Sequence, residues 1–368
     1  MIYADYAATS GYHSDKVINA VVNAMKNPGN AGRGSHEAAL SAARTVYDAR
    51  QAAAKLFGAD DPSQVAFTCG ITMSLNIAIK GLLKPGDHAV TTYAEHNSVL
   101  RPLYEMRKLG VELTVTAPDA ESIKRALKSN TKAVIMTCAS NVTGDVYDFS
   151  GAGKLCRENG IVFIADTAQY AGTYPVLMDE DNIDVLCFTG HKGIMGPQGT
   201  GGIITRKEIV LRPFVTGGSG VHSFSETHPS EMPTVLEAGT LNTPGIAGLR
   251  EAIDEVDFDG NDGLKYAEKF YNGIKELPGI EFYGSYSDWS RRTPIVAFNI
   301  GNYDSSDVSR ELSERFGIET RAGAHCAPLM HEHLGTRDRG IVRASFGKGN
   351  TYEETEQCIE AVRTLVME

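Results

Sequence analysis

The chain has 368 residues, more than one hydrophobic core usually supports, so we expect a large domain and a smaller one. Its composition, 42% hydrophobic and 22% charged, is that of a soluble globular protein, and no apolar run approaches the roughly 18 residues that indicate a membrane span. The formal net charge of -11 argues against nucleic acid as a ligand, because nucleic-acid binding relies on clustered Lys and Arg.

The N-terminal residues, Met1 to Ser10, form neither a basic segment nor an apolar one of the kind that directs export. We therefore expect a cytoplasmic protein.

Helical and β-rich patterns alternate over the first half of the chain. An amphipathic helix ending near Gly58 is indicated by Leu40, Ala43 and Tyr47, and another by Leu75, Ala78, Ile79 and Leu82; we expect both apolar stripes to lie in the core. The expected strands are residues 64–68, 88–93, 111–116, 133–137, 161–165 and 184–189. This alternation predicts βαβ units, hence an α/β fold with a mainly parallel sheet.

A second α/β unit is indicated after about residue 250. Its expected elements are a helix with Leu264, Ala267, Tyr271 and Ile274, a strand at residues 295–300, and a helix with Val308, Leu312 and Phe316. The last helix begins at a capping box, Thr351 with Glu354, and buries Cys358, Ile359, Val362 and Leu365. We expect domains at residues 1–250 and 251–368, with residues 1–15 packed on the smaller one.

The six cysteines are scattered without a Cys-x-x-Cys spacing, which indicates free thiols. Five of them lie in apolar or periodic stretches, where cysteine is usually a small buried side chain: Cys69, Cys138, Cys156, Cys187 and Cys358. The sixth, Cys326, differs from them.

Polar residues follow the expected strands, and in a parallel sheet ligands collect outside the carboxyl ends of the strands. Thr72 follows the first strand and opens a helix whose N–H groups would favour a phosphate. The later strands are followed by His96, by Asn141, and by Asp166 with Gln169. The last strand runs into Thr189-Gly190-His191-Lys192-Gly193.

Each of these residues alone is ordinary, since a lysine after a strand is usually solvated and an aspartate there often caps a helix. Together they meet the needs of pyridoxal 5'-phosphate (PLP): a lysine for its aldehyde, an anion for its pyridine nitrogen, and donors for its phosphate. Lys192 is the candidate Schiff-base residue and Asp166 the candidate anion. Phosphate donors would be the helix start at Thr72, helped by Thr189 and His191.

Two other kinds of site are not supported. The glycine-rich segment 196–202 does not fit the P-loop pattern G-x-x-x-x-G-K-[ST]. Five histidines are too loosely spaced to form a zinc site with Cys326, so we expect no metal: His13, His36, His325, His331 and His333. Residues 217–233, rich in Gly, Ser and His, are a candidate mobile loop.

Eight motifs, in order along nearly the whole chain, resemble the class V aminotransferase-like branch of fold-type I PLP enzymes. Within that branch the chain is similar to the cysteine desulfurases and selenocysteine lyases. The motifs are Tyr3 to Thr9, Glu95-His96, Ser140-Asn141-Val142, Asp166-x-x-Gln169, Gly190-His191-Lys192, Glu237-Ala238-Gly239-Thr240, Arg321-x-Gly323-x-His325-Cys326-Ala327-Pro328-Leu329, and Arg343-Ala344-Ser345.

The resemblance implies a role for each matching residue. Lys192 would hold PLP, Asp166 would pair with the pyridinium nitrogen, Gln169 would contact the ring hydroxyl, and His96 would stack on the ring. Phosphate contacts would come from Thr72, Thr189 and His191, and from Thr240 of a neighbouring subunit, which implies a homodimer. Asn141, beside the cofactor, and Arg343 would bind the substrate carboxylate.

Cys326 resembles the sulfur-accepting cysteine of the short-loop group, whose motif reads R-x-G-x-H-C-A-x-P-L. Here one residue is missing, because Ala327 is followed directly by Pro328. The implied reaction moves the α-proton of L-cysteine through Lys192 or His96, transfers sulfur to the Cys326 thiolate as a persulfide, and releases L-alanine. A sulfur-acceptor protein in iron–sulfur or thio-cofactor assembly would follow. His325 is a candidate base for the thiol, although adjacent side chains in loops often diverge.

Other functions remain open on the sequence. A selenocysteine lyase would use the same site on L-selenocysteine and release selenium. Another PLP enzyme of this branch would catalyse aminotransfer or epimerisation, against which Cys326 argues. A non-catalytic binding protein on the same fold would need no Lys192.

Overall fold

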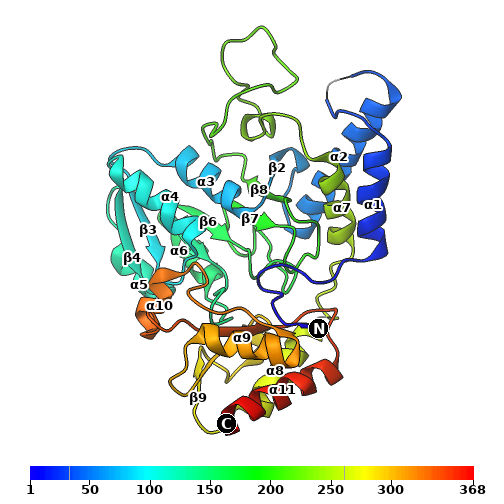
Figure 1. The fold of residues 1–368 in the computed structure, drawn as a ribbon. Coiled ribbons are helices and arrows are strands. Elements are labelled where there is room, and N and C mark those ends of the chain that lie inside the picture. The colour runs from blue at the N-terminus through cyan, green and yellow to red at the C-terminus, as the bar shows by residue number, and fades with distance from the viewer. Residues whose placement is uncertain (33, 261) are drawn as a thin grey trace.

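The computed structural model describes residues 1–32, 34–260 and 262–368, and its centre is a seven-stranded sheet (Figure 1). Five neighbouring strands, in the order β7-β6-β5-β3-β4, run parallel, and β8 lies antiparallel between β7 and β2. The expected α/β fold with a mainly parallel sheet is confirmed. The strands are β2 (Val65–Thr68), β3 (His88–Thr92), β4 (Glu112–Thr116), β5 (Thr131–Thr137), β6 (Val162–Asp166), β7 (Val185–Thr189) and β8 (Gly201–Thr205).

Both faces of this sheet are covered, which is why its strands are apolar on both sides. In β6, Phe163 and Ala165 pack into one core cluster and Val162 and Ile164 into another. Helices α2, α6 and α7 contribute to the first cluster, and α3 and α4 to the second. The helices of this part are α1 (Asp15–Lys26), α2 (Glu37–Leu56), α3 (Ile71–Leu82), α4 (Asn97–Lys108), α5 (Ala120–Ala126), α6 (Phe149–Glu158) and α7 (Thr243–Asp254), with 3-10 turns η1 (Pro62–Gln64) and η2 (Thr234–Leu236).

Strand β8 was not expected from the sequence, because two of its five residues are glycine, which disfavours strands. The glycines allow close packing. A Cβ atom on Gly201 would lie 2.6 Å from the carbonyl oxygen of Phe188, and one on Gly202 would lie 2.5 Å from the Phe188 ring. Side chains there would push β8 away from β7.

The buried face of α2 differs from the expected one. Leu40 and Tyr47 are 41% and 54% exposed, so the prediction that they lie in the core is wrong. The core is instead reached by a stripe of small residues: Ala39, Ala42, Val46, Ala49 and Ala53. These small residues let α2 pack closely on its neighbours, which a search for large apolar side chains does not detect.

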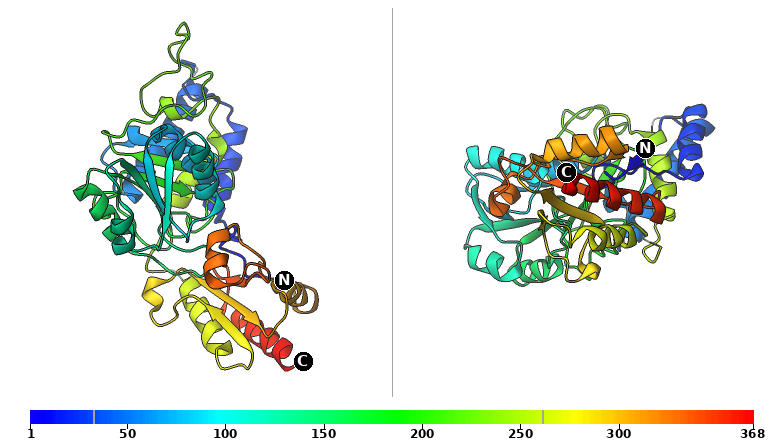
Figure 2. Two further views of the ribbon diagram at one scale, coloured as in Figure 1. Left: turned by 90° about the vertical axis from the view of Figure 1, so that its left-hand side faces the viewer. Right: turned by 60° about the horizontal axis from the view of Figure 1, so that its bottom comes forward.

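The C-terminal part forms a separate cluster around a three-stranded antiparallel sheet, in the order β12-β10-β9 (Figure 2). The expected strand at residues 295–300 is β10, and the expected capping box of Thr351 and Glu354 is present. The elements are α8 (Asp262–Ile274), β9 (Ile280–Tyr283), η3 (Trp289–Arg291), β10 (Ile295–Ile300), α9 (Ser305–Phe316), β11 (Ile318–Glu319), α10 (Pro328–Leu334), β12 (Val342–Ser345) and α11 (Tyr352–Met367).

The N-terminal strand β1 (Ile2–Tyr3) pairs in parallel with β11, and Ile2 and Ala4 lie in the C-terminal cluster. Helix α7 continues through residue 250 to Asp254, and its Ala252 and Ile253 pack in the core of the large sheet. The two-domain division stays a prediction, and we propose its boundary in the segment after α7.

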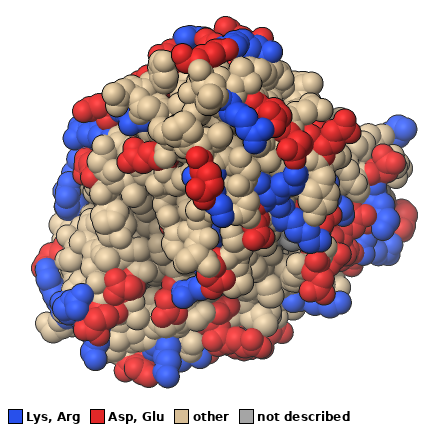
Figure 3. All heavy atoms as spheres, turned by 90° about the horizontal axis from the view of Figure 1, so that it is seen from below, with Lys and Arg blue, Asp and Glu red and all other residues tan. Residues whose placement is uncertain are grey.

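The surface of the C-terminal part carries both charge signs. On the face seen from below, Lys and Arg side chains are interspersed with Asp and Glu (Figure 3). Within the described residues, the search for a helix long and apolar enough to cross a membrane finds none.

The capping box of α11 gives a first prediction. Thr351 Oγ1 accepts the Glu354 N–H, and Glu354 Oε2 accepts the Thr351 N–H, both at 3.1 Å. Thr351→Ala removes one of these bonds at an exposed position, so we expect the free energy of unfolding to fall by about 1 kcal/mol. Urea titration followed by circular dichroism measures it, with Thr351→Ser as the control that keeps the cap; equal midpoints for the two variants would contradict the assignment.

Candidate active site

The predicted site residues lie where the parallel strands end. Asp166 is the last residue of β6, and it pairs in register with Thr137 of β5 and Cys187 of β7. His96 follows β3, and Asn141 and Lys192 follow β5 and β7. Because the carboxyl ends of parallel strands meet at one edge, these side chains are brought to the same rim.

Lys192 lies in a tight turn after β7. The Gly196 N–H donates to Gly190 O at 2.7 Å and closes this turn, and a Cβ on Gly193 would lie 2.5 Å from Ala171 O. Burial lowers the pKa of Lys192 to about 8; Asp166 opposes this shift, while Arg343 adds to it. About a tenth of the amine is therefore neutral at pH 7, far more than for an ordinary lysine, and the neutral amine is the nucleophile.

Asp166 supplies the nearby negative charge. Its side chain is buried, and Oδ1 accepts the Ala168 N–H at 2.9 Å. Burial raises the pKa of Asp166, whereas the bond from Ala168 and the charge of Lys192 lower it. The carboxylate is thus positioned as the partner of a buried cation.

His96 is the N-cap of α4 and has a defined tautomer. Its Nδ1 accepts the Ser98 N–H at 3.0 Å, so the proton of the neutral ring lies on Nε2. Burial, followed by the charge of Lys192, lowers the pKa of His96 to about 4. The ring is neutral at physiological pH and presents a donor.

Two of the predicted phosphate residues, Thr72 and Thr189, lie at the start of α3. Gly70 is the N-cap of this helix, with φ 140°, and as a glycine it offers no side chain to the first N–H groups of the helix. Its own N–H donates to Thr68 Oγ1 at 3.2 Å. A Cβ on Gly70 would lie 3.7 Å from Thr189 Oγ1. Thr72 Oγ1 lies 2.8 Å from Ser98 Oγ, which joins the helix start to the residue that holds His96.

Two further predicted phosphate residues lie differently. His191 Nδ1 lies 3.0 Å from Thr9 Oγ1, so its ring contacts the N-terminal segment. Thr240 has an exposed side chain next to Gly239, whose N–H donates to Gly218 O at 2.8 Å. Residues 217–233 are mostly exposed, and their mobility stays a prediction.

Arg343 and Asn141, the predicted carboxylate ligands, contact each other. Arg343 is buried, and its Nη1 donates to Asn141 O at 2.8 Å. Its Nη2 donates to Asp5 Oδ1 at 2.8 Å, and its Nε has no partner within the described residues. The sequence did not predict that Asp5 pairs with Arg343. Asp5 lies inside the first motif, but the motif does not reveal which cation its carboxylate contacts.

The Cys326 loop is held by residues of the sheet rim. The Asn97 N–H donates to Cys326 O, and Asn141 Nδ2 donates to His325 O, both at 2.7 Å. Cys326 itself is exposed. The loop therefore presents a thiol next to the His96 and Asn141 segments, which these two bonds connect to its backbone.

His325 does not face the neighbouring thiol. Both His325 and Cys326 have left-handed backbone conformations, with φ 46° and 56°. The His325 side chain turns inward, its Nε2–H donates to Ile341 O at 3.0 Å, and burial holds its pKa well below the usual range. The geometry does not support His325 as the base for Cys326.

Two further histidines, both in α10, have partners of their own. His331 is buried with Nδ1 2.8 Å from Thr336 Oγ1, and His333 stacks on Tyr93 at 4.1 Å between ring centroids.

Cys69, expected to be buried, is exposed at the turn after β2, while the other four cysteines of that group are buried. The turn, which the apolar run before it does not reveal, brings Cys69 to the surface.

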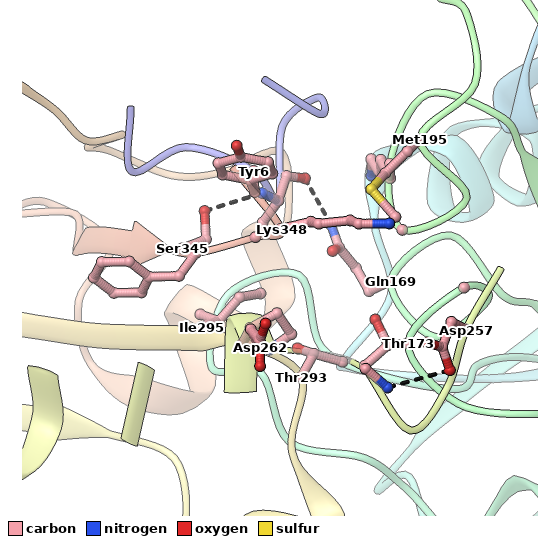
Figure 4. Close-up of a pocket in the computed structure, with 18 of the residues that line it drawn as sticks. Tyr6, Gln169, Thr173, Met195, Asp257, Asp262, Thr293, Ile295, Ser345 and Lys348 are labelled. Carbon is pink, nitrogen blue, oxygen red and sulfur yellow. Dashed lines mark hydrogen bonds between the residues drawn. The ribbon is translucent and has the colours of Figure 1, made fainter. Parts of the chain in front are cut away.

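Gln169 lines a cavity whose wall also includes Tyr6 and Met195 (Figure 4). Its Nε2 donates to Ala7 O at 2.9 Å. The cavity encloses about 820 Å³, open space at its mouth included, and Lys192, Ser345 and Lys348 also line it. His96, Asp166 and Arg343 are not among its lining residues, so this cavity is not the whole site.

Glu95 is a buried acid that sequence reasoning did not single out from its motif. Its Oε1 accepts the Thr92 hydroxyl at 2.7 Å and the Thr137 N–H at 3.1 Å, so it joins the His96 turn to β5. Its Oε2 has no partner within the described residues. Burial raises the pKa of Glu95 to about 8, so it is mainly neutral at pH 7.

The described part of the chain contains no cluster of three or more His, Cys, Asp or Glu side chains arranged to hold a metal ion.

Comparison with known proteins gives concordant results. Residues 2–358 match the family model described as "Aminotransferase class-V". A "Probable cysteine desulfurase" of Methanothermobacter thermautotrophicus is 32% identical over 99% of this chain and 94% of its own, and a "Cysteine desulfurase IscS" of Vibrio campbellii is 30% identical over 99% and 92%. The apo structure of a cysteine desulfurase from Thermococcus onnurineus superposes with a TM-score of 0.89 at 30% identity, covering 100% of this chain and 94% of that one. The structure of the Escherichia coli cysteine desulfurase CsdA superposes with a TM-score of 0.87 at 26% sequence identity. The match covers 99% of this chain and 94% of that one.

The lowered pKa of Lys192, about 8, gives a second prediction. The initial rate at which the apoprotein captures added PLP should follow the neutral amine, rising about tenfold between pH 7 and pH 9 and levelling off above it. Stopped-flow absorbance measures the rate, with Lys192→Arg as the blank. An ordinary lysine would give about a hundredfold rise over the same interval, and a rate still climbing steeply at pH 9.5 would contradict the shift.

Proposed function

The chain belongs to the class-V aminotransferase family, and on that premise we propose that it is a PLP-dependent cysteine desulfurase that transfers sulfur from L-cysteine to Cys326 and releases L-alanine. One observation carries the proposal: the exposed Cys326 thiol lies on a loop whose peptide groups are held by Asn97 and Asn141, beside the rim that carries Lys192. Relatives named cysteine desulfurase, matched over nearly the whole chain, support it.

The donor set fits PLP. Lys192 would bind the aldehyde carbon, Asp166 the pyridine nitrogen, and His96 one face of the ring. The start of α3 at Gly70 and Thr72, where the N-cap glycine has no side chain, would bind the phosphate together with Thr189, because helix N-termini favour anions. His191 would assist there, and Gln169 would lie near the ring hydroxyl. When bound, PLP supplies an electron sink that weakens the bonds at the α-carbon of the substrate.

The protonation states separate the two candidate acid–base groups. His96 carries its proton on Nε2 and uses Nδ1 as the helix cap, so neither nitrogen is free to accept a proton. Lys192, with a pKa of about 8, accepts and returns protons near neutral pH. We therefore assign the movement of the α-proton to Lys192 and the positioning of the ring to His96.

Arg343 and Asn141 would orient the substrate. The buried guanidinium still has N–H groups to offer, including the Nε–H, which has no partner among the described residues, and can take a carboxylate in a two-point contact. The Cys326 thiolate then attacks the substrate sulfur. A sulfur–sulfur bond forms, the carbon–sulfur bond breaks, and the carbon takes a proton to leave as L-alanine, with a persulfide on Cys326.

We further propose a homodimer that acts in the cytoplasm and passes sulfur to an acceptor protein, as in iron–sulfur cluster assembly. Apolar side chains that a second copy could cover are exposed on α1 and α2: Ile18, Val22, Met25, Leu40 and Tyr47. The exposed Thr240 would reach the phosphate site of the partner subunit.

A selenocysteine lyase is the second candidate, because the same donors would accept L-selenocysteine. The deciding measurement is L-alanine release from L-cysteine and from L-selenocysteine, with a thiol reductant and no partner protein. We expect turnover of L-cysteine at least comparable to that of L-selenocysteine. Turnover confined to L-selenocysteine would replace the desulfurase proposal with the lyase, and formation of a keto acid would exclude both.

Cys326→Ala gives a more specific prediction. The variant should keep bound PLP and its visible absorbance but lose persulfide formation and at least about 99% of L-alanine release from L-cysteine, because only a positioned thiolate takes the sulfur. Cys69→Ala removes the other exposed cysteine and should leave both activities unchanged. Full activity of the Cys326 variant would show that another group receives the sulfur.

A further inference from the structure

Arg292 carries a buried charge that the reaction proposed above does not use. Its side chain is fully buried, and Nη1 lies 2.7 Å from Asp145 Oδ1. Nη2 donates to Thr143 O at 2.5 Å and to Ile295 O at 3.1 Å. The guanidinium thus joins the loop after β5, residues 140–146, to strand β10 of the C-terminal sheet.

The planar guanidinium is stacked as well as bonded. Its central carbon lies 3.7 Å from the centroid of the Tyr286 ring and 5.4 Å from that of Trp289. Tyr286 in turn stacks on Tyr271, with centroids 4.2 Å apart. A lysine at this position could not reproduce both the flat stacking and the fork of donors.

The loop that Arg292 holds is compact. Ser140 N–H donates to Asp145 O at 2.9 Å, and Gly144 N–H donates to Ser140 O at 3.1 Å. Thr293 N–H donates to Gly144 O at 2.7 Å, beside Arg292 on the chain. Holding residues 143–145 therefore fixes the whole loop, including Asn141.

Asn141 passes this constraint to the substrate site. Its carbonyl oxygen accepts Arg343 Nη1 at 2.8 Å, and its side-chain amide donates to His325 O at 2.7 Å. A shift of the loop would move the acceptor that orients Arg343.

We propose that Arg292 is a positioning residue for amino-acid recognition: through the 140–146 loop and Asn141 it sets the orientation in which Arg343 receives the substrate carboxylate. This rests on the proposed function only in that the substrate is an amino acid bound by Arg343.

Arg292→Lys in the holoenzyme tests the proposal. The KM for L-cysteine should rise roughly tenfold, with kcat changed less than about threefold, because the binding of the carboxylate is weakened while the reacting groups stay in place. The dissociation constant of L-alanine, titrated by the absorbance of the bound cofactor, should rise by a similar factor. Unchanged KM and L-alanine affinity together with a lower melting temperature would overturn the proposal and leave Arg292 a purely structural residue.

A second variant and a matched control guard against misfolding. Asp145→Asn keeps the shape of the partner and should shift KM in the same direction by a smaller factor. Arg206→Lys is the control, since Arg206 also bonds main-chain carbonyls, those of Met178 and Ile183, away from the 140–146 loop. It should lower stability without raising KM; a rise equal to that of Arg292→Lys would contradict a specific role for Arg292.

Trp289 provides a readout that is independent of activity, because it is the single tryptophan of the chain and lies beside Arg292. In the apoprotein, Arg292→Lys should increase acrylamide quenching of its emission, and Arg206→Lys should not. The L-alanine titration does not require turnover. If the wild type released no alanine from L-cysteine, the proposed function would fail while the role of Arg292 could still be decided.

Discussion

The site depends on keeping one positive and one negative charge, Lys192 and Asp166, buried at the carboxyl edge of a single sheet. Burial disfavours both charged forms, and each charge partly offsets that cost for the other. Burial acts on the neighbouring groups as well. It raises the pKa of Glu95 to about 8, with a smaller contribution from Asp166, and it lowers the pKa of His96 to about 4, with a further contribution from Lys192. Titratable groups whose pKa values are pushed apart in this way divide charge and donor roles among themselves.

The anion site for the substrate is assembled from three distant parts of the chain. Arg343 meets Asp5, 338 residues away, and Asn141, 202 residues away. Asp5 keeps the buried guanidinium paired and oriented, so a substrate carboxylate meets a cation whose direction is already set. Asp5 belongs to the N-terminal segment, Asn141 follows β5 of the large sheet, and Arg343 lies in β12 of the C-terminal sheet. All three parts therefore contribute to one contact.

The sequence could predict which residues gather at the rim, because a parallel sheet brings the ends of its strands together whatever the helices between them do. It could not predict features that depend on close packing or backbone conformation. Strand β8 relies on glycines that fit against Phe188, and the buried face of α2 is a stripe of alanines. The bond between Arg292 and Asp145 spans 147 residues and involves two residue types that are usually solvated. The outward turn of Cys326 and the inward turn of His325 follow from two left-handed residues in succession.

The loop that carries His325 and Cys326 also bears on how sulfur could leave the enzyme. The carbonyl groups of His325 and Cys326 are both bonded to residues of the sheet rim, and α10 begins at Pro328, two residues after the cysteine. A loop tethered in this way keeps the thiol beside the site. Such a tether favours attack on a bound substrate, since a fixed thiolate lies close to its target. It also requires any acceptor to approach Cys326, so the surface around the loop, rather than the reach of the loop, would decide which molecule takes the sulfur.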